Sequence, residues 1–158
     1  MLVIFVDGDA CPVKGEVEQV AARHGLTVTI VSNGGLRPSR NPLVRHVTVD
    51  AGADAADDWI VEHAGEGDLV ITADIPLASR ALKKGARVLG PTGKPFTEQS
   101  IGMALGLRDL HRHLRESTTG GQTFNAGFTK QDRSRFLNML ENEIQALRRI
   151  FAGRPPPA

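Results

Sequence analysis

The sequence predicts an α/β domain with a central, mostly parallel sheet of about five strands, helices on both faces and a helical C-terminal half. Strand-like and helix-like segments alternate over residues 1–90, the order typical of right-handed parallel connections. Two strand-like runs, residues 2–6 and 69–73, are almost entirely apolar, as in strands covered on both faces. The length of 158 residues suits one domain, which we expect over residues 1–152, followed by a flexible Pro-rich tail at 153–158.

The strands are expected where short runs of aliphatic or β-branched residues stand between turn residues. These runs are residues 2–6, 26–31, 44–49, 68–72 and 86–89. The last of them is short, and a long polar loop follows the second. Together they account for the five strands of the predicted sheet.

The helices are expected where apolar residues recur at helical spacing, from about 12 to 24, 54 to 64 and 76 to 84. Another helix begins at Thr97 or Ser100. Thr129 and Asp132 have the spacing of a capping pair before a last helix. That helix carries an apolar stripe, interpreted as core packing, which consists of Phe136, Leu140, Ile144, Leu147 and Phe151.

The composition argues against a disordered, fibrous or membrane-spanning protein. Apolar residues at 41% and charged residues at 23% are ordinary globular values. No apolar run approaches the length of a membrane span, and the N-terminal run lacks the basic flank of a signal peptide. The single cysteine, Cys11, permits no internal disulfide, which fits a reducing compartment. We expect a cytoplasmic protein without a membrane partner.

Charge is divided unevenly along a chain whose net charge is +1. Residues 1–79 hold 12 acidic and 5 basic residues, whereas residues 80–158 hold 6 acidic and 14 basic ones. Such asymmetry indicates a nucleic-acid partner. An equally weighted alternative is that the two halves neutralise each other across the fold. Because aromatic residues make up only 4%, we expect a nucleic acid to be held by its phosphates rather than by base stacking.

Aspartates gather where the predicted strands end. Asp7 and Asp9 follow the first strand, Asp74 follows the fourth, and Asp54 and Asp57 begin the helix between them. Ligands of open α/β sheets bind beyond the carboxyl ends of the strands, so we expect these side chains to converge. Converging carboxylates need a compensating cation, and oxygen ligands suit Mg²⁺ or Mn²⁺. We predict a metal site formed by the five acids, with Asp7 and Asp74 as the catalytic pair.

These acids also have a structural interpretation. Asp9, Asp54 and Asp74 each precede a predicted helix, where aspartate is a favoured N-cap. Asp58 lies one position round the helix from Asp57 and fits a solvated face. Asp68 begins its strand, so we expect it at the opposite edge of the sheet in a structural role.

Basic residues are expected to meet a phosphate backbone. Three arginines recur at spacings of four and three and therefore share one helix face, away from the leucines of the same segment. The alternative for such a face is simple solvation. The cations predicted to bind nucleic acid are Lys14, Arg37, Lys83, Arg108, Arg112, Arg115 and Arg133.

Several strings of the chain resemble the uncharacterised bacterial YaiI/YqxD family over nearly its whole length. They include VDGDACPVK at 6–14, GADAAD at 52–57 and GDLVITADIPLA at 67–78. That family is grouped with PIN-like domains, whose active members bind Mg²⁺ or Mn²⁺ and cleave RNA. The resemblance implies a PIN-like three-layer fold, with Asp7 and Asp9 as the first acid, Asp54 or Asp57 as the middle acid and Asp74 as the later acid. A fourth acid, frequent in active PIN nucleases, has no match.

Three functions follow from these observations. The leading hypothesis is a metal-dependent ribonuclease of PIN-like type. The second is a haloacid-dehalogenase-like phosphatase in which Asp7 is the nucleophile and Asp9 the general acid/base, with Thr72 and Lys83 in its next two motifs, although its later acid is missing. The third is a non-catalytic nucleic-acid or protein binding module whose acids only cap helices.

Overall fold

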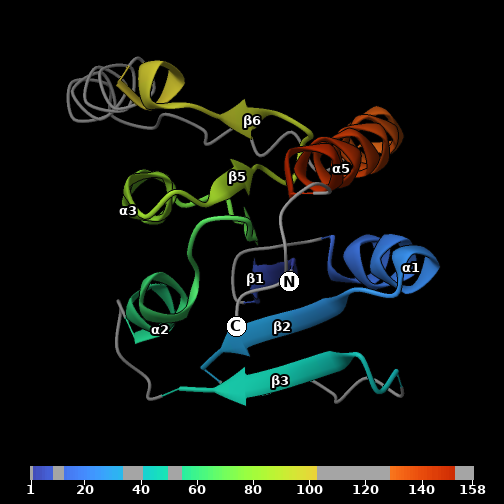
Figure 1. Cartoon of the computed structure of the whole chain (residues 1–158), viewed down its shortest axis with the longest axis horizontal. Helices are drawn as coiled ribbons and strands as arrows, with labels where there is room; N and C mark the ends of the chain where they lie inside the picture. Colours follow the sequence, from blue (N-terminus) through green and yellow to red (C-terminus); the bar gives the residue numbers. More distant parts are fainter. Residues whose placement is uncertain (1, 9–12, 34–40, 50–54, 103–128, 152–158) are drawn as a thin grey trace, which may run out of the picture.

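The structure is a computed structural model that describes residues 2–8, 13–33, 41–49, 55–102 and 129–151. Its centre is one six-stranded sheet with the order β3-β2-β1-β4-β5-β6 (Figure 1). The strands are β1 Val3–Asp7, β2 Thr27–Ser32, β3 Val44–Thr48, β4 Leu69–Ile71, β5 Arg87–Leu89 and β6 Pro95–Phe96. The first five are parallel, which confirms the predicted sheet, and β6 adds an antiparallel edge strand.

Helices cover both faces of this sheet, as predicted. Helices α1 (Lys14–His24) and α5 (Lys130–Phe151) lie on one face, and α2 (Ala55–His63) and α3 (Ile75–Lys83) lie on the other (Figure 1). Alternate residues of β1 serve the two layers: Ile4 and Val6 pack with α1 and α5, whereas Phe5 packs with α2 and α3. A parallel sheet that is buried on both sides needs this apolar continuity.

Strand β6 was not predicted, because two residues are too few to show a strand pattern. The strand follows a tight turn in which the Gly90 amide donates to the Lys94 carbonyl at 2.9 Å. Gly93 in this turn has φ of +90°, a left-handed value that favours glycine. Pro95 then begins the strand without an amide donor, as is common on a sheet edge.

Helices α1 and α5 run parallel to each other. At one end the Arg133 Nε lies 2.9 Å from Glu16 Oε1, and at the other the His24 Nε2 lies 2.6 Å from Glu141 Oε2. Four residues of the predicted α5 stripe are buried: Phe136, Leu140, Ile144 and Leu147. The structure does not describe the side chain of the fifth, Phe151. The stripe is therefore core packing over its described length.

The predicted capping pair before α5 is present. The Thr129 amide donates to Asp132 Oδ2 at 3.1 Å, and the Asp132 amide donates to Thr129 Oγ1 at 3.0 Å. These reciprocal bonds satisfy two amides at the start of the helix. They explain why α5 begins at residue 130.

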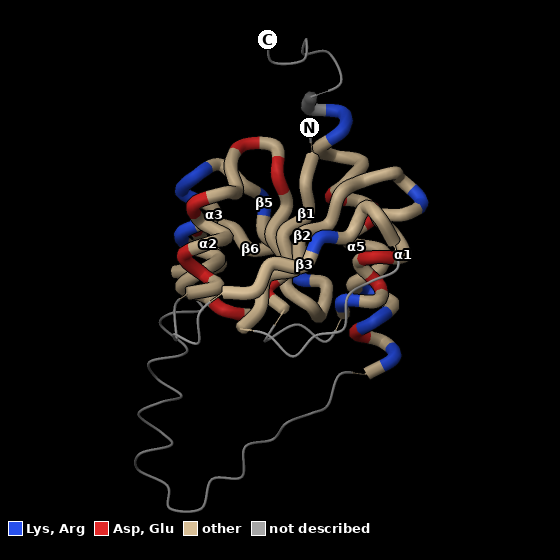
Figure 2. Tube along the Cα trace, turned by 90° about the horizontal axis from the view of Figure 1, so that it is seen from below, with Lys and Arg blue, Asp and Glu red and all other residues tan. Residues whose placement is uncertain are grey.

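Part of the charge asymmetry is neutralised within the fold. The Arg80–Asp58 and Arg133–Glu16 pairs each join a base of the second half to an acid of the first. Figure 2 shows Lys and Arg interspersed with Asp and Glu along the outer helices. Within the described ranges, no helix combines the length and the apolar character needed to cross a membrane.

Candidate functional site

The strand order reverses between β1 and β4. From β1 the chain builds outward through β2 to β3, then returns to the other side of β1 to form β4 and β5. In open α/β sheets this switch point, at the carboxyl ends of the strands, is where ligands bind. Asp7 is the last residue of β1, and Thr72 follows β4 directly. We call this side of the sheet the strand-end edge.

Asp7 and Thr72 meet at the switch point because Val6 and Ile71 are register partners. The Asp7 side chain belongs to a residue only 5% exposed, and Thr72 is fully buried. Thr72 Oγ1 donates to Asp7 Oδ2 at 3.0 Å and accepts from the Asp74 amide, also at 3.0 Å. A carboxylate this deeply buried needs such hydrogen bonds, and the chain of contacts orients it.

The backbone after Asp7 is held from two sides. The Gly8 amide donates to the Val31 carbonyl of β2 at 2.8 Å. The Gly8 carbonyl accepts from Lys14 Nζ at 2.9 Å. Lys14, a residue predicted to bind nucleic acid, therefore begins α1 close to Asp7.

Asp74 is the N-cap of α3, as its structural interpretation predicted, and this role uses only one of its carboxylate oxygens. Its Oδ1 accepts from the Leu77 amide at 3.0 Å, the contact of an N-cap for α3. Its Oδ2 makes no hydrogen bond to the described residues. Since capping uses one oxygen, the other is available to a ligand.

Asp57 and Asp58 of α2 differ in exposure, and Asp58 lies on a solvated face as predicted. Asp57, in the first turn, is partly buried, whereas Asp58 is exposed and its Oδ1 lies 2.8 Å from Arg80 Nη1. Because α2 leads from the end of β3 back to the start of β4, its first turn lies at the strand-end edge. Asp9 and Asp54 lie outside the described residues. Among the residues that are described, no three His, Cys, Asp or Glu side chains gather as a metal-binding group, so the five-acid site stays a prediction.

Asp68 has the structural role that its position predicted. Its Oδ1 accepts from the Val3 amide at 3.2 Å and its Oδ2 from the Gly65 amide at 3.0 Å. Burial raises the pKa of Asp68, and the two amide contacts oppose that shift without cancelling it. Asp68 thus ties the beginnings of β1 and β4 together at the opposite edge of the sheet.

The predicted nucleic-acid ligands are not all brought to one place. Lys83 is exposed at the far end of α3, about 12 Å along the helix axis from its start beside Asp74. Arg133 lies at the start of α5, paired with Glu16. The remaining four lie outside the described residues: Arg37, Arg108, Arg112 and Arg115.

Two hydroxyl residues at this edge were not part of the predicted metal site. Thr72 contacts Asp7 directly, and Ser32 is buried at the end of the neighbouring strand β2. The available signal was a hydroxyl residue at the end of an apolar run. Only the register between strands reveals which acid it faces.

Residues 5–146 match the uncharacterised YaiI/YqxD family. The chain belongs to this family. The UPF0178 protein of Parvibaculum lavamentivorans is 61% identical over 159 residues, which cover 99% of this chain and 100% of that protein. The UPF0178 protein of Mesorhizobium japonicum is 61% identical over 153 residues, 97% and 96% of the two chains. That of Rhizobium meliloti is 56% identical over 147 residues, 93% and 100%. These names state no activity, so they confirm the family resemblance and leave the chemistry to the site.

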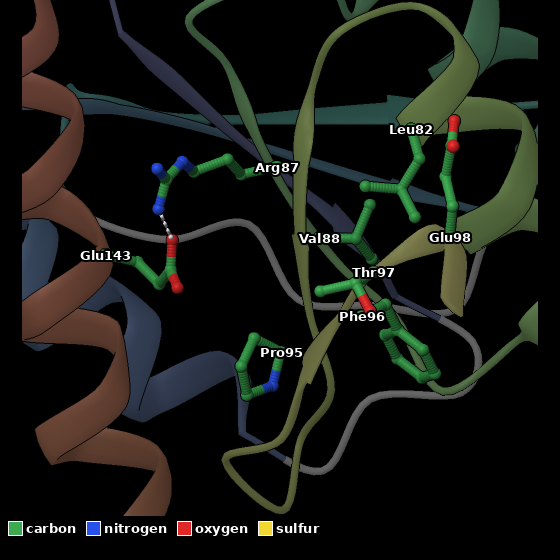
Figure 3. A pocket seen from close by; sticks show the side chains of 8 residues that line it. All are labelled: Leu82, Arg87, Val88, Pro95, Phe96, Thr97, Glu98 and Glu143. Atoms are coloured by element: carbon green, nitrogen blue, oxygen red, sulfur yellow. Dashed lines mark hydrogen bonds and ion pairs between the residues drawn. The ribbon is translucent and has the colours of Figure 1, made fainter. Parts of the chain in front are cut away.

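This YaiI/YqxD protein also has a cavity of about 400 Å³ beside β6 (Figure 3). Leu82, Val88 and Phe96 line one side of it, and Arg87 faces Glu143 on the other, with Nη1 and Oε2 2.8 Å apart. Arg87 begins β5, so the cavity lies toward the opposite edge of the sheet from Asp7. It is separate from the predicted metal site.

Proposed function

We propose that this YaiI/YqxD protein is a divalent-metal-dependent nuclease that hydrolyses RNA phosphodiesters at the switch point between β1 and β4. The supporting observation is the buried Asp7 carboxylate at the end of the central strand, oriented by Thr72, with Asp74 two residues further along. The PIN-like resemblance of the family supplies the substrate class.

The chemistry of the donor atoms fits Mg²⁺ or Mn²⁺. Mg²⁺ keeps several waters and is commonly held by one or two carboxylates together with substrate phosphates. Asp7 and the Oδ2 atom of Asp74 provide carboxylate oxygens from adjacent strand ends, and Asp9, Asp54 and Asp57 are the predicted additional ligands. When bound, such an ion would activate water and stabilise the charge that develops on phosphate.

The chain's own residues prepare this site in three ways. Thr72 fixes one oxygen of Asp7, so the carboxylate is oriented before any ligand arrives. Asp74 is held by its capping bond to Leu77. Lys14 secures the backbone that follows Asp7 and places a positive charge where a phosphate would approach.

Two positions weaken the phosphatase alternative. The lysine predicted for that mechanism, Lys83, lies at the opposite end of α3 from Asp74, although Lys14 lies close to Asp7. It also needs an acid after a further strand, but β5 ends at Leu89 and is followed by Gly90 and Pro91. The Thr72–Asp7 bond suits either enzyme, so the assays must separate them.

Cleavage of an unstructured single-stranded RNA with Mn²⁺ tests the proposal. Asp7→Asn should lower the rate by at least about 100-fold, because loss of a first ligand should exceed the effect of losing an outer-shell partner. Asp58→Asn on α2 is the matched control, since it removes one carboxylate from an exposed ion pair. RNA cleavage at an unchanged rate in Asp7→Asn would refute the nuclease mechanism. Hydrolysis of a phosphomonoester without RNA cleavage would favour the phosphatase alternative.

Calorimetric titration with Mn²⁺ supplies a readout besides activity. Wild type and Asp58→Asn should bind the ion, whereas Asp7→Asn and Asp74→Asn should bind it much more weakly. Because asparagine still caps α3, Asp74→Asn tests metal ligation rather than helix stability. If Mn²⁺ binding is absent, or the same in all four proteins, the non-catalytic binding module becomes the leading function.

A further inference from the structure

We propose that Lys94, Lys130 and Arg135 form a second RNA contact, the α5 patch, which binds the sugar-phosphate backbone of a single strand beside the strand-end edge. The identity of the anion as RNA rests on the proposed function. The patch itself rests on the position, exposure and charge of these three residues. It does not depend on catalysis.

The turn after β5 brings Lys94 to the beginning of α5. β5 ends at Leu89 on the strand-end edge, and the turn packs so closely on α5 that a Cβ on Gly93 would lie 2.7 Å from the Arg135 carbonyl carbon. Lys94 follows Gly93 directly. Helix α5 begins at the same edge, because Arg133 pairs with Glu16 in the first turn of α1.

The cations of the α5 patch are open to an anionic ligand. Lys94 and Lys130 are exposed, and their side chains form no hydrogen bond or ion pair with other described residues. Arg135 is about half exposed, and its Nη1 lies 3.6 Å from Asp132 Oδ1. That separation exceeds the length of a hydrogen bond, so Asp132 neutralises Arg135 only in part.

The titration of Asp132 is consistent with this arrangement. Its pKa lies below the usual value chiefly because the Thr129 amide donates to it, and the charges of Arg135 and Lys94 contribute further. Lys94 is thus near enough to act on an acid of α5. The positive charge of the patch comes from two elements rather than from a single helix face.

The placement of these cations opposes helix stability. The first turns of a helix carry a partial positive charge, so each cation there costs about 0.3–1 kcal/mol, and acids are favoured instead. In its first turn α5 has Lys130 and a single acid, Asp132, and Arg133 and Arg135 follow immediately. Local choices that work against the fold often serve a binding function, and a bound phosphate would offset the repulsion.

The geometry also connects the α5 patch to the proposed catalytic site. β4 alone separates β5 from β1, so the strand ends of β1 and β5 are about 10 Å apart. A short single strand that enters at Asp7 can therefore extend over the end of β5 to Lys94. Because lysine and arginine read phosphate charge, we expect binding without sequence preference and with strong salt dependence.

Fluorescence anisotropy with a labelled oligouridine in EDTA tests the α5 patch without cleavage. The double variant Lys94→Gln/Lys130→Gln should weaken binding on the order of tenfold and reduce the slope of log K against log salt by about 1.4, since each phosphate contact on a single strand contributes about 0.7. The matched control is Arg23→Gln/Arg149→Gln. It removes two exposed positive charges at the ends of α1 and α5 away from the strand-end edge.

Equal weakening by both double variants would overturn the proposal, as would failure of the wild type to bind the oligonucleotide. Equally tight binding of polyglutamate would also overturn it, by indicating an acidic protein partner. Asp7→Asn separates the two proposals. If it binds RNA like the wild type and neither protein cleaves with Mn²⁺, the α5 patch stands and the nuclease function fails.

Discussion

Replacing Thr72 with valine removes one hydroxyl from a fully buried side chain and keeps its shape. That hydroxyl donates to the Asp7 carboxylate and accepts from the Asp74 amide, both at 3.0 Å. Losing a hydrogen bond to a charged group costs about 1.5–3 kcal/mol, and the amide left without its acceptor adds about 1 kcal/mol. The free energy of unfolding should therefore fall by about 2.5–4 kcal/mol at neutral pH. Urea denaturation, followed by the fluorescence of the single tryptophan, Trp59, measures this change.

Thr72→Ser is the matched control, because it keeps the hydroxyl and removes one methyl group. It should cost about 1 kcal/mol. In a double-mutant cycle with Asp7→Ala, Thr72→Val should show a coupling of about 1–3 kcal/mol. Mn²⁺ affinity should fall by about 10- to 100-fold in Thr72→Val and recover in Thr72→Ser, since Thr72 acts as a positioning residue. Equal urea midpoints for the valine and serine variants would refute the reasoning.

Three further predictions concern residues whose contacts are equally well defined. Asp74→Ala should lower the free energy of unfolding by about 1 kcal/mol through loss of the α3 cap, and Asp74→Asn should restore most of it in urea denaturation. Gly93→Ala should destabilise the fold by roughly 2–4 kcal/mol, since it adds a backbone clash to a left-handed φ. The control Gly25→Ala should cost about 1 kcal/mol, because Gly25 has a φ of +66° but open space around it. Similar melting temperatures for the two variants would contradict this prediction. The hydrogen bond from His24 lowers the pKa of Glu141 in the folded protein below its ordinary value of 4.5. The ionised carboxylate therefore stabilises the fold fully at pH values above 4.5. This stabilisation is lost as the pH falls through the lower pKa of the folded state. Thermal unfolding should thus separate wild type from Glu141→Gln at about pH 6 and bring them together at about pH 3; a gap that stays constant with pH would argue against the linkage.

Local sequence features predicted most of the fold. The five parallel strands and the described helices lie within two residues of their expected bounds, because apolar period and capping chemistry depend on neighbours in the chain. Thr129 and Asp132 form the predicted capping pair, and Asp68 holds the beginnings of two strands as its position indicated. By contrast, the edge strand β6 was missed, since two residues have no period and their pairing is decided by the turn before them.

The sequence by itself determined that acidic side chains follow buried strands, and it placed Asp7 and Asp74 at strand ends. Only the tertiary structure decided that β1 and β4 are neighbours and that Thr72 is the partner of Asp7. It also decided that Lys83 lies far from both residues, and that the turn before Lys94 packs against Arg135. Strand order and register arise from contacts between residues distant in the chain, so no local pattern encodes them. The acids could therefore be identified from the sequence, whereas the groups that orient them and the cations that surround them required the fold.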